Sequence, residues 1–169
     1  MVGRKSIGGY FWPIVDSQGV ATQQKGAIGG YDAAKHTKGR KRHIVVDVLG
    51  LILAVAVTGA NVQDRVGGQL VLSGLKDRFA RIERVWADGA YAGQLVEWAE
   101  KAAQFVLDIV RKPKGQIGFS VLPWRWIVER TFAWLANYRR LARDYEISPR
   151  TSEAWIKIAM IHLMVRRLA

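Results

Sequence analysis

Two apolar runs joined by a short turn limit the possible folds of this chain more than any other feature. HIVVDV (43–48) and LILAVAV (51–57) are rich in β-branched residues and meet at Leu49-Gly50, a pattern that predicts a β-hairpin. Strands this apolar are usually covered on both faces of a sheet. The hairpin therefore predicts a sheet with helices packed against it.

The rest of the chain alternates between strand and helix patterns. GYFWPIVDSQ predicts a buried strand that ends at Asp16, where Ser17-Gln18-Gly19 signals a turn. The later elements are expected to be a helix near 64–77 capped by Asn61, a strand at 83–88, a helix at 91–103, a strand at 105–110, and helices at about 123–143 and 151–168. This order predicts a single α/β domain over residues 1–169, with a mixed five-stranded sheet flanked by helices.

The charge of the chain favours a nucleic acid as its partner. Lys and Arg number 26 against 14 acidic residues, which gives a formal net charge of +12. Residues 19–43, rich in Gly and Lys, predict a mobile basic loop, and RKPKG (111–115) is a weaker candidate for contact with DNA. The expected contacts with the DNA backbone in the first loop are Lys35, Lys38, Arg40, Lys41 and Arg42. A solvated basic loop without a partner is the alternative.

Several classes of protein are excluded by what the sequence lacks. It contains no cysteine, which excludes a disulfide framework, a thiolate zinc site and a cysteine nucleophile. No run of about 18 uncharged apolar residues is present to span a membrane, and the N-terminus lacks the apolar stretch of a signal peptide. We therefore expect a cytoplasmic protein.

Three carboxylates are candidates for a metal site. Asp16 and Asp88 each follow an apolar strand, at the sheet edge where ligands bind in open α/β folds. Glu129 lies in WRWIVERTFAW (124–134), where helical spacing places it on the polar face with Arg125. Mg²⁺ prefers oxygen ligands, and two such ions can support the cleavage of a phosphodiester bond. The three acids are thus candidates for metal-dependent cleavage of nucleic acid.

Each of these acids also has a purely structural explanation. Asp16 and Asp88 stand where Asp commonly forms turns, and Arg125 and Glu129 have the spacing of an ordinary ion pair on a helix surface. The competing acidic residues are Asp32, Asp47, Asp64 and Asp108. Two of these, Asp47 and Asp108, lie in apolar runs, the pattern of a buried structural acid. Spacing alone does not rank the candidates.

Several blocks of the sequence together resemble the insertion-sequence-five family of DDE transposases. The blocks are GYDAAKHTKGRKRHIVVDVLGLILAVAV, NVQDR, VWADGAYAG, and RWIVERTFAWL followed by YRRLARDYE. They occur in order from about Ile14 to the C-terminus. The resemblance implies a ribonuclease-H-like fold and a catalytic Asp-Asp-Glu triad of Asp16, Asp88 and Glu129. It also implies two Mg²⁺ ions bound by this triad, with Mn²⁺ as a substitute.

The region around Glu129 is similar to a signature of related transposases, in which Tyr, Arg, Glu and Lys are separated by two, three and six residues. Arg125 and Glu129 fit this signature, whereas Leu122 and Ala136 occupy the Tyr and Lys places. Contacts with DNA phosphates are therefore expected from the arginines of this region: Arg125, Arg130, Arg139 and Arg140.

The resemblance implies a transposase catalytic domain that cleaves DNA at insertion-sequence ends and transfers the strands to target DNA. It also implies a homo-oligomer on the DNA and a prokaryotic, nucleoid-associated location. Relatives usually carry a helical DNA-end-binding region before the first catalytic strand, and this chain starts shortly before Asp16. We expect that region to be encoded separately or fused by frameshifting. The alternative function is a catalytically idle DNA-binding remnant or regulator.

Overall fold

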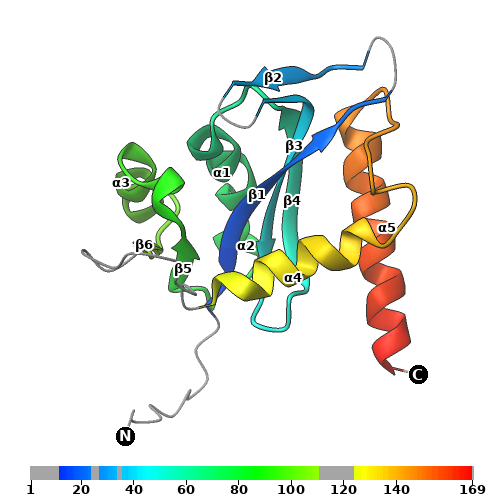
Figure 1. Cartoon of the computed structure of the whole chain (residues 1–169). Helices are drawn as coiled ribbons and strands as arrows, with labels where there is room; N and C mark the ends of the chain where they lie inside the picture. Colours follow the sequence, from blue (N-terminus) through cyan, green and yellow to red (C-terminus); the bar gives the residue numbers. More distant parts are fainter. Residues whose placement is uncertain (1–11, 24–26, 34–35, 111–123, 169) are drawn as a thin grey trace, which may run out of the picture.

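A twisted sheet of mixed strand directions, with helices on both faces, forms the centre of the computed structural model (Figure 1). The structure describes residues 12–23, 27–33, 36–110 and 124–168. The arrangement confirms the predicted α/β class and is consistent with a ribonuclease-H-like fold. The sheet has six strands in the described part of the chain, one more than the sequence predicts.

The six strands combine antiparallel and parallel pairs. They are β1 (Ile14–Ala21), β2 (Gly30–Asp32), β3 (Thr37–Val46), β4 (Ile52–Gly59), β5 (Arg84–Ala87) and β6 (Val106–Ile109). Their order is β2-β3-β1-β5-β6, and β4 also pairs with β3. β3 is antiparallel to β1, β2 and β4, which includes the predicted hairpin, whereas β1, β5 and β6 run parallel. The three parallel strands run in the same direction, and β1 extends beyond the ends of β5 and β6.

The segment 19–43 is the clearest departure from the sequence prediction. β1 does not end at Asp16 but continues to Ala21, and β3 already begins at Thr37. All eight residues of β1 are paired with β3. The polar residues 17–19 do not end the strand because this antiparallel ladder satisfies their backbone groups. The prediction of a mobile loop is therefore wrong for the parts of this segment that form β1, β2 and β3.

The helices lie close to the predicted positions; all are shorter than predicted except the last, which begins two residues earlier. They are α1 (Asp64–Leu72), α2 (Leu75–Arg78), the 3-10 helix η1 (Gly89–Tyr91), α3 (Gln94–Lys101), α4 (Arg125–Ala136) and α5 (Pro149–Leu168). The helix predicted near 64–77 is split into α1 and α2. Gly74, the N-cap residue of α2, has a φ of 67°, which breaks the helical backbone between them. Its N-cap residue is Gln63 rather than Asn61.

Two apolar clusters form the core, one on each face of the sheet. Val15, Val45 and Ala54 pack with α1, α2 and α3, whereas Ile14 and Ile44 pack with α4 and α5. Neighbouring residues of one strand thus belong to opposite clusters, as the alternation of side chains along a strand requires. This alternation assigns each functional side chain to a face of the sheet.

Candidate active site

Asp16 and Asp88 lie at equivalent positions on neighbouring strands. β1 and β5 are parallel, and Ile14 is paired with Trp86. Each Asp follows its paired residue by two positions in extended backbone, so both side chains point to the face of the sheet that Ile14 and Trp86 occupy. That face carries α4, and both acids line one small cavity together with Arg125. The fold thus brings two of the three candidate acids together.

Each of these carboxylates also orders the backbone that follows it. One oxygen of Asp16 accepts a hydrogen bond from the N–H of Ser17 at 2.7 Å. One oxygen of Asp88 accepts from the N–H of Ala90 at 2.9 Å and caps η1. The turn-forming explanation therefore applies to Asp88, but it uses only one of its two oxygens. The other oxygen faces Arg125.

Arg125 connects Asp88 with Glu129. Its Nη1 lies 3.6 Å from Asp88 Oδ2, and its Nε lies 3.1 Å from Glu129 Oε1. The side chains of Arg125 and Glu129 are 42% and 59% exposed, so water reaches both groups. The ordinary ion pair expected from the spacing is present, but the same guanidinium also reaches the end of β5. Arg125 is therefore the link between α4 and Asp88 at the end of β5.

Aromatic packing fixes the start of α4 against the sheet. The rings of Trp86 on β5 and Trp124, the N-cap residue of α4, lie 5.0 Å apart. Trp12 packs edge-on against the other side of Trp86 at 5.4 Å. Because Arg125 directly follows Trp124, this contact places its guanidinium over the end of β5. The three tryptophans are thus part of the framework of the site.

A polar network supports β1 from the opposite face of the sheet. The Ser17 hydroxyl donates to Asp64 Oδ1 at 2.7 Å, and Lys41 Nζ lies 3.1 Å from the same oxygen. Lys41 also lies 3.4 Å from Asp32 and donates to the carbonyl of Val62. Two of the competing acids, Asp32 and Asp64, therefore share a nearly buried lysine. The sequence analysis missed this network, although Ser17 directly follows Asp16.

Tyr91 experiences the negative charge of this whole region. Burial raises the pKa of its phenol well above the usual value, and the charges of Asp16, Asp64 and Asp88 raise it further. Tyr91 is 1% exposed and packs against Gly68 of α1, where a Cβ would lie 2.8 Å from its ring. The signal in the sequence that could have indicated this contact is its place three residues after Asp88.

The family of the chain follows from comparison with known proteins. Residues 14–164 match the family model of the transposase DDE domain. The chain belongs to the DDE transposase family. A Burkholderia cepacia protein assigned as a transposase for insertion sequence element IS402 is 33% identical over 129 residues, which span 71% of this chain and 60% of that protein. The resemblance to the insertion-sequence-five family is compatible with both matches, which support a transposase catalytic function in general terms.

The acids of this DDE domain have the donor chemistry that Mg²⁺ or Mn²⁺ prefers. Asp16 and Asp88 offer carboxylate oxygens from separate elements, so they fit a divalent ion as a pair. Within the described ranges, however, no three acidic or His side chains are grouped so that they could hold a metal ion. Glu129 is instead paired with Arg125, whose positive charge balances the carboxylates.

The other two competing acids of the DDE domain have structural roles. Asp47 is 9% exposed, and its Oδ1 accepts from the N–H groups of Leu49 and Leu51 in the hairpin turn. This confirms the interpretation of Asp47 as a buried structural acid. Asp108 is not buried, since its side chain is 44% exposed and pairs with Arg84 at 2.7 Å.

Most of the DNA contacts predicted on the first basic segment are contradicted by burial. Arg40, Lys41 and Arg42 are 0%, 4% and 2% exposed, because alternate residues of β3 point into the two layers beside the sheet. Lys38 is exposed on β3 and remains a candidate. Lys35 and the RKPKG segment lie outside the described residues.

The arginines in and after α4 lie at least partly at the surface. Arg130 packs between Trp126 and Trp134 and donates to the carbonyl of Leu49. Arg139 is exposed, and Arg140 forms a 2.7 Å ion pair with Glu146. Of the two remaining signature positions, residue 122 lies outside the described residues, and Ala136 is the last residue of α4.

No helix in the described part of the domain is long and apolar enough to cross a membrane.

Proposed function

We propose that this domain cleaves DNA phosphodiester bonds at insertion-sequence ends and transfers the strands to target DNA, with Asp16, Asp88 and Glu129 as catalytic metal ligands. The observation that carries the proposal is the parallel placement of Asp16 and Asp88, which face one cavity beside Arg125. Two unrelated turn-forming acids have no reason to converge on the same face of the sheet. Membership of the DDE family supplies the class of reaction.

The proposed reaction consists of two phosphoryl transfers. In cleavage, a water oxygen bonds to phosphorus while the bond to the 3′ oxygen breaks, which frees a 3′-hydroxyl. In strand transfer, that hydroxyl bonds to a target phosphorus and a target 3′-hydroxyl leaves. Mg²⁺ or Mn²⁺ bound by the carboxylates would activate the attacking oxygen and stabilise the leaving oxygen. The chain itself contributes position and charge.

Arg125 has a defined part in this proposal. Its partly exposed guanidinium is held at the site by two carboxylates, and a planar guanidinium also matches the oxygens of a phosphate. When Asp88 and Glu129 take up their proposed role as metal ligands, the guanidinium is released to bind the DNA backbone. Arg125 would then orient the phosphate that reacts.

Nicking and joining of labelled oligonucleotides test the proposal. The wild-type domain is compared with Asp88→Asn at low salt, with Mg²⁺, with Mn²⁺ and with chelator, and duplex binding is measured for each. Asp108→Asn is the matched control, because Asp108 lies on the neighbouring strand β6 and is paired with an arginine outside the site.

We expect metal-dependent nicking by the wild type and by Asp108→Asn, and none by Asp88→Asn. Binding of the duplex by all three proteins would show that the substitution removes chemistry rather than fold. Wild-type binding without nicking in either metal would contradict the proposal for this chain and favour the catalytically idle DNA-binding protein. Equal nicking by wild type and Asp88→Asn would remove Asp88 from the site.

A further inference from the structure

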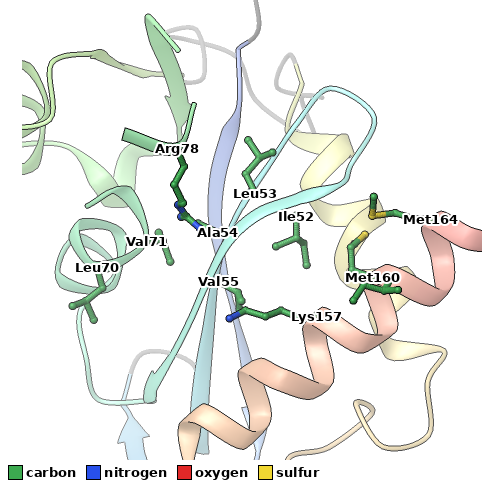
Figure 2. Close-up of a pocket in the computed structure, with 11 residues that line it drawn as sticks. Ile52, Leu53, Ala54, Val55, Leu70, Val71, Arg78, Lys157, Met160 and Met164 are labelled. Atoms are coloured by element: carbon green, nitrogen blue, oxygen red, sulfur yellow. The ribbon is translucent and has the colours of Figure 1, made fainter. Parts of the chain in front are cut away.

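A groove of about 390 Å³ runs beside the outer edge of β4, away from the acids of the candidate active site (Figure 2). Residues 52–55 of β4 form its floor, and one wall comes from α1 and α2 while the other comes from α5. The side chains that line the walls include Leu70, Val71, Arg78, Lys157, Met160 and Met164. The groove therefore consists of a strand edge between two helical walls.

The outer edge of β4 presents backbone groups to this groove. In the described part of the chain β4 pairs with β3 alone. The N–H of Val57 points away from β3 and donates to Glu153 Oε1 at 3.0 Å. Because N–H groups alternate between the two edges of a strand, the N–H of Val55 points outward as well. The carboxylate of Glu153 thus already accepts from the outward N–H of Val57, whereas Val55 lines the groove.

The walls of the groove are apolar and exposed. Leu70 is 55% exposed, Ile161 is 59% exposed and Met164 is 42% exposed. Contiguous apolar surface of this kind marks a site of interaction, and Met side chains adapt to different partners. These walls suit the alternating side chains of an added strand.

The charge at the groove indicates which kind of strand would fit. Arg78 and Lys157 stand on opposite walls, and neither forms an ion pair within the described residues. A second copy of this chain, with a net charge of +12, would bring the same cations against each other. An acidic segment would meet both cations with opposite charge.

We propose that this groove binds an extended segment of another protein, which adds to β4 as a strand and carries carboxylates next to an apolar centre. The bound strand donates to and accepts from the outward backbone groups of β4, including Val55. Its apolar side chains enter the two walls, and its carboxylates pair with Arg78 and Lys157. This site uses neither the candidate catalytic acids nor DNA, so it is independent of the proposed function.

Fluorescence anisotropy with a synthetic probe tests this site. The probe is a fluorescein-labelled peptide of four central Val residues flanked by two Glu on each side, and its control carries Lys in place of Glu. The protein variants are Lys157→Glu, which reverses a groove charge, and Val55→Pro, which removes an outward N–H without breaking the pairing with β3. Arg150→Glu is the matched control, because Arg150 is exposed on α5 outside the groove. Circular dichroism checks that each variant folds.

We expect the Glu probe to bind at least tenfold more tightly than the Lys probe. Lys157→Glu and Val55→Pro should each weaken the Glu probe at least tenfold, whereas Arg150→Glu should leave it unchanged. Absent binding, equal binding of the two probes, or equal binding by folded Lys157→Glu would each overturn the proposal. Self-association of the wild type that is lost in Val55→Pro would assign the groove to a second copy instead. Self-association that appears only in Lys157→Glu would mean that Lys157 merely protects a free strand edge.

Discussion

β3 and α4 each carry two arginines, but the two elements use them in different ways. On β3, Arg40 and Arg42 are almost completely buried, whereas the side chain of Arg125 on α4 is 42% exposed. Both segments look equally suited to DNA in the sequence. The difference shows that a basic run identifies a nucleic-acid surface only when the element that carries it lies at the surface.

The burial of Arg40 is possible because the protein satisfies its guanidinium. Its Nη1 lies 3.0 Å from Asp144 Oδ1 and 2.9 Å from the Ser152 hydroxyl, and its Nε donates to the carbonyl of Ile28 at 2.8 Å. Its Nη2 donates to the carbonyl of Ile147. Asp144 precedes α5 and Ser152 lies in its first turn, so Arg40 fastens the start of α5 to β3. Arg40 is therefore part of the core rather than of a surface that could meet DNA.

Replacement of Arg40 should have the largest effect on stability. Arg40→Met leaves the carboxylate of Asp144 buried without its partner, which typically costs about 3–5 kcal/mol of unfolding free energy. Urea denaturation followed by circular dichroism measures the loss. Lys38→Met, at an exposed position of the same strand, is the control and should change the unfolding free energy by less than about 0.5 kcal/mol. A loss in Arg40→Met no larger than in this control would mean that the buried pair does not hold the region before α5.

Replacement of Arg42 should have a smaller effect. Burial lowers the pKa of its guanidinium, and the charge of Asp144 offsets only part of this shift, so the site disfavours the charged form. The main loss in Arg42→Met is the 2.8 Å hydrogen bond to the buried carbonyl of Leu141, worth about 1–3 kcal/mol. The same denaturation experiment ranks the two variants. A cost equal to that of Arg40→Met would show that Arg42 belongs to the ion pair with Asp144.

The sequence predicted the layers of the fold better than their edges. The two apolar runs of the hairpin, which became the end of β3 and all of β4, predicted the sheet because buried strands are rich in apolar residues. The length of β3 was missed, since its first half is polar and its two arginines are buried through contacts with Asp144 and Leu141, about a hundred positions away. No local pattern in KHTKGRKRH records those partners.

The candidate site shows the same division. The sequence predicted that Asp16 and Asp88 would lie close together on neighbouring strands. The pairing of Ile14 with Trp86 places them there, although β1 continues beyond Asp16 to Ala21. The roles of Ser17 and Asp64 were missed because their contact crosses 47 positions of sequence. The i, i+4 spacing of Arg125 and Glu129 predicted their ion pair, but it does not contain the second contact of Arg125, with Asp88.

Replacement of Arg125 should have the smallest effect on stability and a clear effect on activity, which completes the contrast with β3. Its ion pairs are solvent-exposed, so Arg125→Gln should cost less than about 1 kcal/mol of unfolding free energy. If the proposed function holds, the same variant should nick DNA more slowly than the wild type, because the guanidinium that orients the phosphate is lost. Arg150→Gln is the matched control, since Arg150 is exposed on α5 and forms no ion pair among the described residues. A large loss of stability in Arg125→Gln would place this arginine in the same structural class as Arg40. Unchanged stability together with unchanged nicking would instead mean that Arg125 only forms surface ion pairs. The arginines of β3 and α4 would then differ in burial alone.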